Sequence, residues 1–270
     1  AYILFGLSRA QQQGVAVPDA VIQKAVDYVF SGLFTADMTT PAWQLDRLAF
    51  QHYTLVNVGF GDLAGLDALY MVKDQLAPWA QAFLALSIDS LSPSDERVKA
   101  LLSNLQTSAI RSASGAHWES DSGDVYNLSS PIFTSAVVLY TLAQLDPAST
   151  LLPDALRYLM DHRQASGSWS STYDTAWSLM AATQVMKGTG ELTGDFGFSA
   201  VLNGTLIANG QAVQGTDVNS VSASVPLSSL YPRDPNGLYI RRDPGPGRLY
   251  YTASLQVHRP VENVEPLSQG

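Results

Sequence analysis

The sequence has 270 residues, of which 46% are hydrophobic and only 14% charged, and its formal net charge is −9. An excess of carboxylates repels phosphate backbones, and no apolar run approaches the roughly 20 residues of a membrane-spanning helix, so we expect neither nucleic acid nor membrane contact for this segment. The absence of cysteine excludes disulfides, thiolate nucleophiles and cysteine-based metal sites.

The first two thirds of the sequence show helical periodicity, interrupted by glycine- and proline-containing turns. The helices that this pattern predicts cover residues 1–13, 19–30, 41–58, 63–72, 78–89, 97–110, 131–145, 153–163 and 172–187. Between them, residues 111–129 are rich in Ser, Gly and Asp and are expected to form a loop.

The predicted helices differ in how much of their surface is apolar. Segments 1–13, 78–89 and 131–145 are apolar nearly all round, whereas their partners are apolar on one side only. A helix that is apolar all round is typical of a buried position, so this difference predicts an inner ring of helices inside an outer ring. The expected fold class is therefore mainly α, an α/α toroid.

One phrase, Ala-x-x-Leu followed by an aromatic residue or Met, occurs at residues 1–5, 136–140 and 176–180. The second and third copies follow loops in which a Gly precedes Trp118 or Trp169, and repetition of this kind indicates stacked helical hairpins. We expect both rings to be buried between neighbouring hairpins. No such loop precedes the first copy, so the toroid is expected to be incomplete at its N-terminal end and the chain to be a piece of a larger protein.

The pattern changes after Gly188, where apolar residues begin to alternate with polar ones. Alternation over residues 196–202, 218–225 and 249–257 predicts antiparallel strands, roughly four in all. Turn signals occur at Asn203-Gly204, Asn209-Gly210, 235–237 and 244–247. We therefore divide the chain into a helical domain, residues 1–190, and a small antiparallel β domain, residues 191–270.

Few residues are candidates for chemistry. Asp174 could act as an acid, but Ser171 three residues before it favours a helix cap. The histidines (His52, His117, His162 and His258) lack metal-ligand spacing. The segment 119–124 lacks the Gly and Glu of a calcium loop, so a solvated loop is the better interpretation.

Arginines gather among the turns of the β domain, at Arg233, Arg241, Arg242 and Arg248. They are either exposed hairpin residues or contacts to another domain. The residues therefore assign no catalytic, cofactor-binding or metal-binding position, and no cofactor is expected.

The order of these elements resembles the bacterial alpha-macroglobulin family. The resemblance is found in the segments 1–7, 43–46, 169–179, 198–204, 225–228, 247–253 and 265–267. The resemblance implies that residues 1 to about 190 are the later part of a thioester domain. It implies that the remainder is the returning half of a CUB-like domain.

In that family, cleavage of a bait region triggers collapse around the attacking protease, and a Cys-x-Glu-Gln thioester acylates it in many members. The resemblance therefore implies an endopeptidase inhibitor, not an enzyme, with an extracytoplasmic location. Its partners would be the neighbouring domains of the parent chain and the trapped proteases. Without cysteine, this chain does not carry the thioester.

A second function class remains open, an α/α-toroid enzyme of the terpene cyclase or polysaccharide lyase type. The segment from Gln164 to Trp169 is close to the Gln–Trp motif of triterpene cyclases, but no Asp-x-Asp-Asp acid motif is present. Such an enzyme would need acids, or a His/Tyr pair, at the mouth of the toroid. Strands after the toroid favour the inhibitor, since cyclases place a second helical barrel there.

Overall fold

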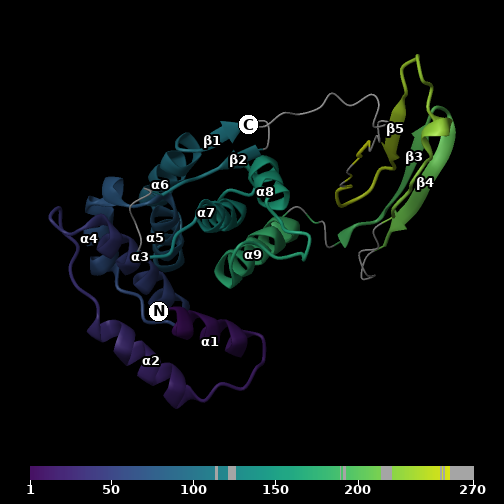
Figure 1. Ribbon diagram of the computed structural model, residues 1–270. Helices are drawn as coiled ribbons and strands as arrows, with labels where there is room; N and C mark the ends of the chain where they lie inside the picture. Colours follow the sequence, from purple (N-terminus) through teal and green to yellow (C-terminus); the bar gives the residue numbers. More distant parts are fainter. Residues whose placement is uncertain are drawn as a thin grey trace, which may run out of the picture. The chain divides into compact units, whose positions relative to one another are not determined.

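The computed structural model describes residues 1–112, 115–120, 126–188, 190, 193–213, 221–249, 251 and 253–255. The chain divides into two compact units, residues 1–189 and residues 190–270. The first unit is helical and the second contains a small antiparallel sheet (Figure 1). The predicted fold class, mainly α followed by a small β region, is confirmed.

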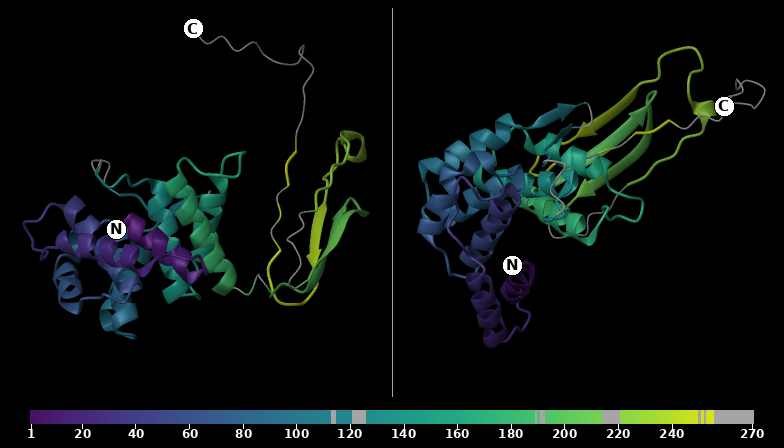
Figure 2. Two further views of the ribbon diagram at one scale, coloured as in Figure 1. Left: turned by 90° about the horizontal axis from the view of Figure 1, so that it is seen from below. Right: turned by 60° about the vertical axis from the view of Figure 1, so that its left-hand side comes forward.

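The helices of the first unit form successive hairpins. In chain order they are α1 (Tyr2–Gln12), α2 (Asp19–Ser31), α3 (Ala42–Asn57), α4 (Leu63–Met71), α5 (Pro78–Leu91), α6 (Glu96–Thr107), α7 (Pro131–Leu145), α8 (Leu152–Asp161) and α9 (Thr172–Gly188). A short 3₁₀ turn, Lys73–Gln75, joins α4 to α5. Figure 2 shows α1 and α2 side by side, as the two arms of one hairpin.

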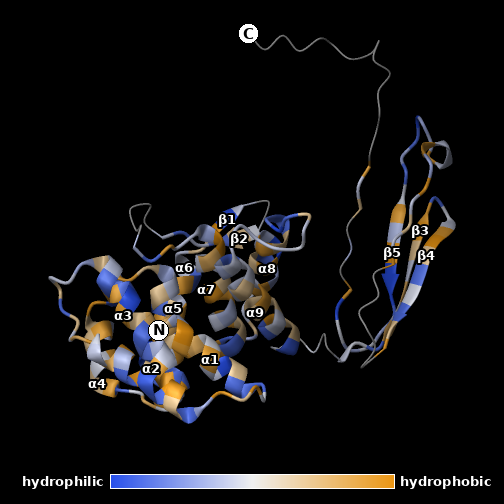
Figure 3. Cartoon of the chain, turned by 60° about the horizontal axis from the view of Figure 1, so that its bottom comes forward, coloured by the Kyte–Doolittle hydropathy of each residue, from blue (hydrophilic) through white to orange (hydrophobic). Residues whose placement is uncertain are grey.

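Helices α3, α5 and α7 form the interior of this unit. Every residue of α7 from Ile132 to Ala143 is buried, and this helix packs against α5, α8 and α9, beside which it is drawn in Figure 3. By contrast, α6 buries only Val98, Leu101 and Leu105, whose spacing of three and four residues forms a single stripe. The predicted difference between all-round and one-sided helices is therefore confirmed for residues 78–89 and 131–145.

Aromatic contacts join the odd-numbered helices into a ring. Their N-terminal turns meet where Tyr173 of α9 contacts Tyr2 of α1 at 4.7 Å and Phe133 of α7 at 4.4 Å, between ring centroids. One turn further on, Phe5 of α1 stacks on Trp177 of α9 at 5.4 Å. These side chains bring α1 into contact with α9, and these helices all run in the same direction.

The expectation that residues 1–13 are buried all round was wrong. Helix α1 is not buried all round: Leu4 and Phe5 face the core, but Ile3 is 77% exposed. In α9 the Leu of the phrase, Leu179, is 53% exposed, whereas Trp177 is buried. The reason is that α9 turns a different face to the ring from α7, so the third copy matches in letters but not in position.

A small hairpin occupies part of the segment that was expected to be loop. Strand β1 (Ile110–Ser112) pairs with β2 (Gly115–His117). Gly115 has a φ of +125°, and a Cβ there would lie 2.2 Å from the backbone oxygen of Asp154 in α8. The hairpin thus packs directly on the backbone of α8, a contact that needs glycine.

The sheet of the second unit has the strand order β4-β3-β5. Strand β3 (Phe196–Leu202) and β4 (Thr205–Ala212) are joined by Asn203 and Gly204, both with positive φ, as the sequence predicted. The turn predicted at Asn209-Gly210 was wrong, because both residues lie inside β4. Gly210 pairs with Phe198, and the aromatic ring fills the space that a Cβ would occupy.

The third strand, β5 (Leu238–Arg242), pairs with β3 between the predicted turns at 235–237 and 244–247. Strands were predicted at 218–225 and 249–257, and the described residues of these two segments form none. Their other residues (218–220, 250, 252, 256 and 257) lie outside the described residues, as does the segment 265–267. A short 3₁₀ turn, Leu227–Ser229, follows Val225 instead. Alternation of apolar and polar residues predicts that a segment has one apolar and one polar face. It does not show whether a neighbouring strand is present, and a β-strand forms only where it can pair with one.

Candidate functional site

The loops that carry Trp118 and Trp169 make equivalent contacts in two successive hairpins. Both side chains are buried, at 0% and 3% exposure. The indole Nε1 of Trp118 donates a 2.7 Å hydrogen bond to the carbonyl of Leu105, near the end of α6. The indole Nε1 of Trp169 donates one of the same length to the carbonyl of Leu159, near the end of α8.

The backbone of each tryptophan binds the next inner helix. The N–H of Trp118 donates to Ser135 Oγ of α7, and that of Trp169 donates to Thr175 Oγ1 of α9, each at 3.0 Å. Each tryptophan therefore ties the end of an outer helix to the first turns of the following inner helix. The prediction that both rings are buried between hairpins is confirmed, and their role is structural.

Ser171 caps α9, and Asp174 lies in the first turn of that helix. The backbone N–H of Asp174 donates to Ser171 Oγ at 3.0 Å, while its carboxylate accepts from Ser171 Oγ at 2.9 Å and from Ser130 Oγ at 2.5 Å. Ser130 in turn caps α7 by accepting from the N–H of Phe133. The cap interpretation is confirmed, and the same carboxylate joins the starts of two inner helices.

A second buried carboxylate was missed in the sequence. Asp46 of α3 is 4% exposed, and its Oδ1 accepts a 2.8 Å hydrogen bond from the N–H of Ala77, the residue before α5. Asp46 stands inside the apolar periodicity of α3, so the available signal was one acidic residue on a buried stripe. Both acids at this end of the ring are engaged with helix starts.

A cavity of about 250 Å³ lies at the end of the ring where the inner helices start. Among its lining residues are Tyr2, Phe50, Trp79, Tyr126 and Tyr173. Trp43 beside it stacks on Tyr126 at 4.5 Å and lies under the guanidinium of Arg47 at 4.9 Å. Aromatic side chains therefore form a large part of the mouth of the ring, and none of the described histidines lines this cavity.

Aromatic rings also fill the interior of the ring below this cavity. Phe83 of α5 lies 5.2 Å from Trp177 and 4.7 Å from Tyr53, between ring centroids. At the far end, Arg9 of α1 donates to the hydroxyl oxygens of Tyr53 at 3.3 Å and Tyr140 at 3.2 Å. Burial raises the pKa of Tyr53, so its hydroxyl stays protonated beside the guanidinium.

The histidines do not form a common site. His52 is buried in α3, and its pKa is lowered by burial in spite of the nearby charge of Asp62. His117 and His162 both contact the ring of Tyr158, with ring centroids 4.5 Å and 4.2 Å apart. The sequence separation between the two histidines does not indicate that they share this contact. His258 lies outside the described residues.

The arginines of the sheet also separate from one another. Arg242 lies over Phe196 and donates to the carbonyls of Gly245 and Gly247, so it holds a turn together. Arg241 pairs with Asp243 at 3.6 Å on the strand surface, and Arg233 is exposed.

Within the part of the chain that the structure describes, no group of His, Cys, Asp or Glu is arranged to hold a metal ion. None of the described helices has the length and apolar character to cross a bilayer. Of the candidate calcium loop, residues 121–124 lie outside the described residues.

No protein-family model matches the sequence, and no curated protein does either. Solved structures do match it. The chain has the fold of a segment of bacterial alpha-2-macroglobulins. The Salmonella protein reacted with methylamine matches 89% of this chain with a TM-score of 0.56 and 15% identity. The Escherichia coli protein from domain MG7 to the C-terminus matches 79% with a TM-score of 0.54 and 14% identity. The native E. coli protein matches 79% with a TM-score of 0.53 and 18% identity.

The resemblance inferred from the sequence is thus confirmed at the level of the fold. The chain spans 14% of the Salmonella alpha-2-macroglobulin and 13% of the native E. coli alpha-2-macroglobulin. At these identities the likeness to the macroglobulins is one of fold, that is, of the arrangement of helices and strands.

Proposed function

We propose that this chain is a segment of an alpha-macroglobulin-like endopeptidase inhibitor, which acts by trapping proteases, and that the segment contributes no catalytic group. One observation carries the proposal. A ring of helical hairpins is followed by a small antiparallel sheet, and 89% of the chain matches that arrangement in the Salmonella alpha-2-macroglobulin.

The proposal assigns a place to each unit. Residues 1–190 would be the later part of a thioester-type domain, and residues 191–270 the returning half of a CUB-like domain. The edge strands of the described sheet support this assignment, because β4 and β5 each pair on one side only. Strands from neighbouring domains of the parent chain would then be the partners of these edges.

Any thioester would lie outside this chain, which contains no cysteine. The Salmonella protein was crystallised after reaction with methylamine. If the parent protein reacts in the same way, the modified residue belongs to a preceding segment. The proposed location is extracytoplasmic, where an inhibitor meets foreign proteases.

An α/α-toroid enzyme is less well supported. A cyclase or lyase would need open space and free acids at the toroid mouth, whereas rings of Phe83 and Trp177 fill the interior. The two carboxylates at the mouth, Asp46 and Asp174, each accept hydrogen bonds at helix starts.

The test uses the protein that carries this chain, before and after limited cleavage by elastase. Trapping by collapse predicts a larger sedimentation coefficient for the cleaved protein than the added mass of retained elastase explains, with the new termini outside residues 1–188. An unchanged sedimentation coefficient after complete single-site cleavage would contradict the proposal. Elastase inactivated by an active-site reagent serves as the control.

A further inference from the structure

The two faces of the sheet differ in exposure. Pairing places Phe198 opposite Gly210 and Ala200 opposite Ile240, and this face is half-buried. The opposite face carries the residues in between. Along β4 and β5 every second residue, including Asn209, Gln211, Tyr239 and Arg241, is exposed.

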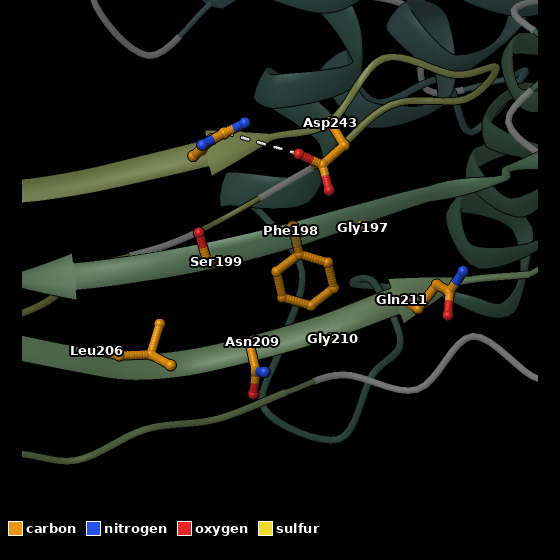
Figure 4. A pocket seen from close by; sticks show the side chains of 9 residues that line it. Gly197, Phe198, Ser199, Leu206, Asn209, Gly210, Gln211 and Asp243 are labelled. Atoms are coloured by element: carbon orange, nitrogen blue, oxygen red, sulfur yellow. Dashed lines mark ion pairs between the residues drawn. The ribbon is translucent and has the colours of Figure 1, made fainter.

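The exposed face contains a hollow of about 600 Å³, shown in Figure 4. Gly197 lies on its floor and has no side chain, and the carboxylate of Asp243 lies 2.6 Å from the place where a Cβ would stand. Because Gly197 has no side chain, the carboxylate of Asp243 can lie over the middle strand, beside the polar side chains of β4.

Several polar groups on this face have no protein partner. Within the described part of the chain, the side chains of Ser199, Asn209 and Gln211 make no hydrogen bond. Asn209 and Gln211 are two residues apart on β4, so both amides project from the same face (Figure 4). Each amide offers two donors and an acceptor.

The charges on this face cancel. Arg241 and Asp243 form an ion pair at 3.6 Å, marked by the dashed line in Figure 4. Their side chains remain 81% and 52% exposed, so both can still bind a ligand. A neutral face with many donors and acceptors does not favour a strongly charged partner.

An aromatic ring completes this face. Tyr239 pairs with Val201, which places it on the same face as Arg241 and Ser199, and it is 72% exposed. An exposed tyrosine offers a flat apolar ring together with a hydroxyl. The C–H groups on one side of a pyranose ring are apolar and pack on such a surface.

We propose that this face, formed by Ser199, Asn209, Gln211, Tyr239, Arg241 and Asp243, binds a neutral oligosaccharide. Amide, guanidinium and carboxylate groups match the paired donors and acceptors of neighbouring sugar hydroxyls. From Tyr239 to Asp243 the strand rises by about 13 Å, which is the length of about two or three sugar rings.

The experiment titrates the chain with maltotriose, cellotriose and triacetylchitotriose, each followed by backbone amide NMR. Trigalacturonic acid is the charged comparison. We expect at least one neutral trisaccharide to shift the amide signals of β4 and β5 at millimolar concentration. The Asn209→Ala/Gln211→Ala double variant and Tyr239→Ala should each weaken this binding at least tenfold.

Tyr231→Ala is the matched control, because Tyr231 is an exposed tyrosine of the same unit outside the strands. It should leave the affinity unchanged, and circular dichroism should show that all variants keep the wild-type fold. The proposal is overturned if no neutral sugar shifts these signals at about 20 mM, a concentration that would detect even weak binding. It is also overturned if trigalacturonic acid binds best and Arg241→Ala alone abolishes binding, since the site would then select anions.

Discussion

At the residue scale, buried polar contacts of a few side chains join each hairpin to the next. Trp118 and Trp169 each donate one side-chain and one backbone hydrogen bond to two different helices. Arg9 of α1 donates hydrogen bonds to residues of two other helices that are farther away in the sequence, Tyr53 of α3 and Tyr140 of α7. Losing the Arg9 side chain would therefore remove two hydrogen bonds between helices, whereas losing either Trp side chain would remove only the one to the outer helix.

Trp169→Ala should lower the free energy of unfolding by about 3–5 kcal/mol, because it leaves a cavity and an unpaired carbonyl at Leu159. Trp169→Phe should cost less, since most of the ring volume remains. Urea unfolding measures both, and we expect a lower midpoint with an unchanged m-value. Tyr28→Ala is the control, because that ring is 78% exposed; an unchanged midpoint for Trp169→Ala would show that the ring is not a structural joint.

His52 should make the stability of the helical unit depend on pH. Burial lowers its pKa in the folded state, so below about pH 6.5 the unfolded chain takes up a proton that the folded chain does not. Its contribution to stability is therefore present above that pH and is lost as the pH falls. The groups that face it are Asp62 and the first turn of α4 at Gly65.

Urea unfolding at pH 7.5 and 5.5 tests this expectation. His52→Gln should reduce the loss of stability between the two pH values relative to wild type. Equal pH dependence in wild type and His52→Gln would mean that His52 does not titrate differently in the folded and unfolded chains.

The sequence predicted some of these residues and not others. A Gly-containing loop before an apolar helix was enough to predict the burial of Trp118 and Trp169. Asp46 and Arg9 could not be predicted, because their partners are 31 and up to 131 residues away in the chain. A long-range polar contact leaves no periodic signal.

At the element scale, helices were predicted well and strands poorly. Helix periodicity is local, so the bounds of α7 agree with the predicted segment 131–145. Strands depend on partners: β4 contains a dipeptide that usually forms turns, and its glycine is accommodated by the ring of Phe198. The hairpin of β1 and β2 is likewise explained only by its contact with α8.

Gly115→Ala should destabilise the helical unit by about 3 kcal/mol or more. The new Cβ would meet the backbone oxygen of Asp154, which cannot move without distorting α8, and the positive φ adds strain. Gly14→Ala is the matched control, because Gly14 also has a positive φ, +83°, but no atom lies within 4 Å of the new Cβ.

Thermal unfolding of the two variants beside wild type gives the comparison. Gly14→Ala should cost only about 1 kcal/mol, the conformational term alone. Equal losses for the two variants would show that the contact between the hairpin and α8 contributes nothing.

At the scale of the whole molecule, the order of a helical ring and a sheet could be predicted, and the contact between α1 and α9 could not. The apolar periodicities of α5 and α7 indicated an inner layer. The contact between Phe5 and Trp177 depends on the angle between each hairpin and the next, which cannot be predicted from sequence periodicity. The exposed face of α1 was missed for the same reason.

The chain alone should show no covalent chemistry. Incubation with methylamine should leave its mass unchanged, because it has no cysteine to form a thioester. Intact-mass spectrometry measures this directly. A stoichiometric mass increase would contradict the assignment of this segment as chemically inert.

The most direct test of the inhibitor proposal compares two substrates of one protease. The protein that carries this chain is mixed with elastase, and cleavage of a large protein substrate and of a small chromogenic peptide is followed in parallel. A protease enclosed in a trap is hidden from large substrates but stays accessible to small ones, so we expect loss of the first activity and retention of the second. Equal inhibition of both activities, or inhibition of neither, would contradict the account.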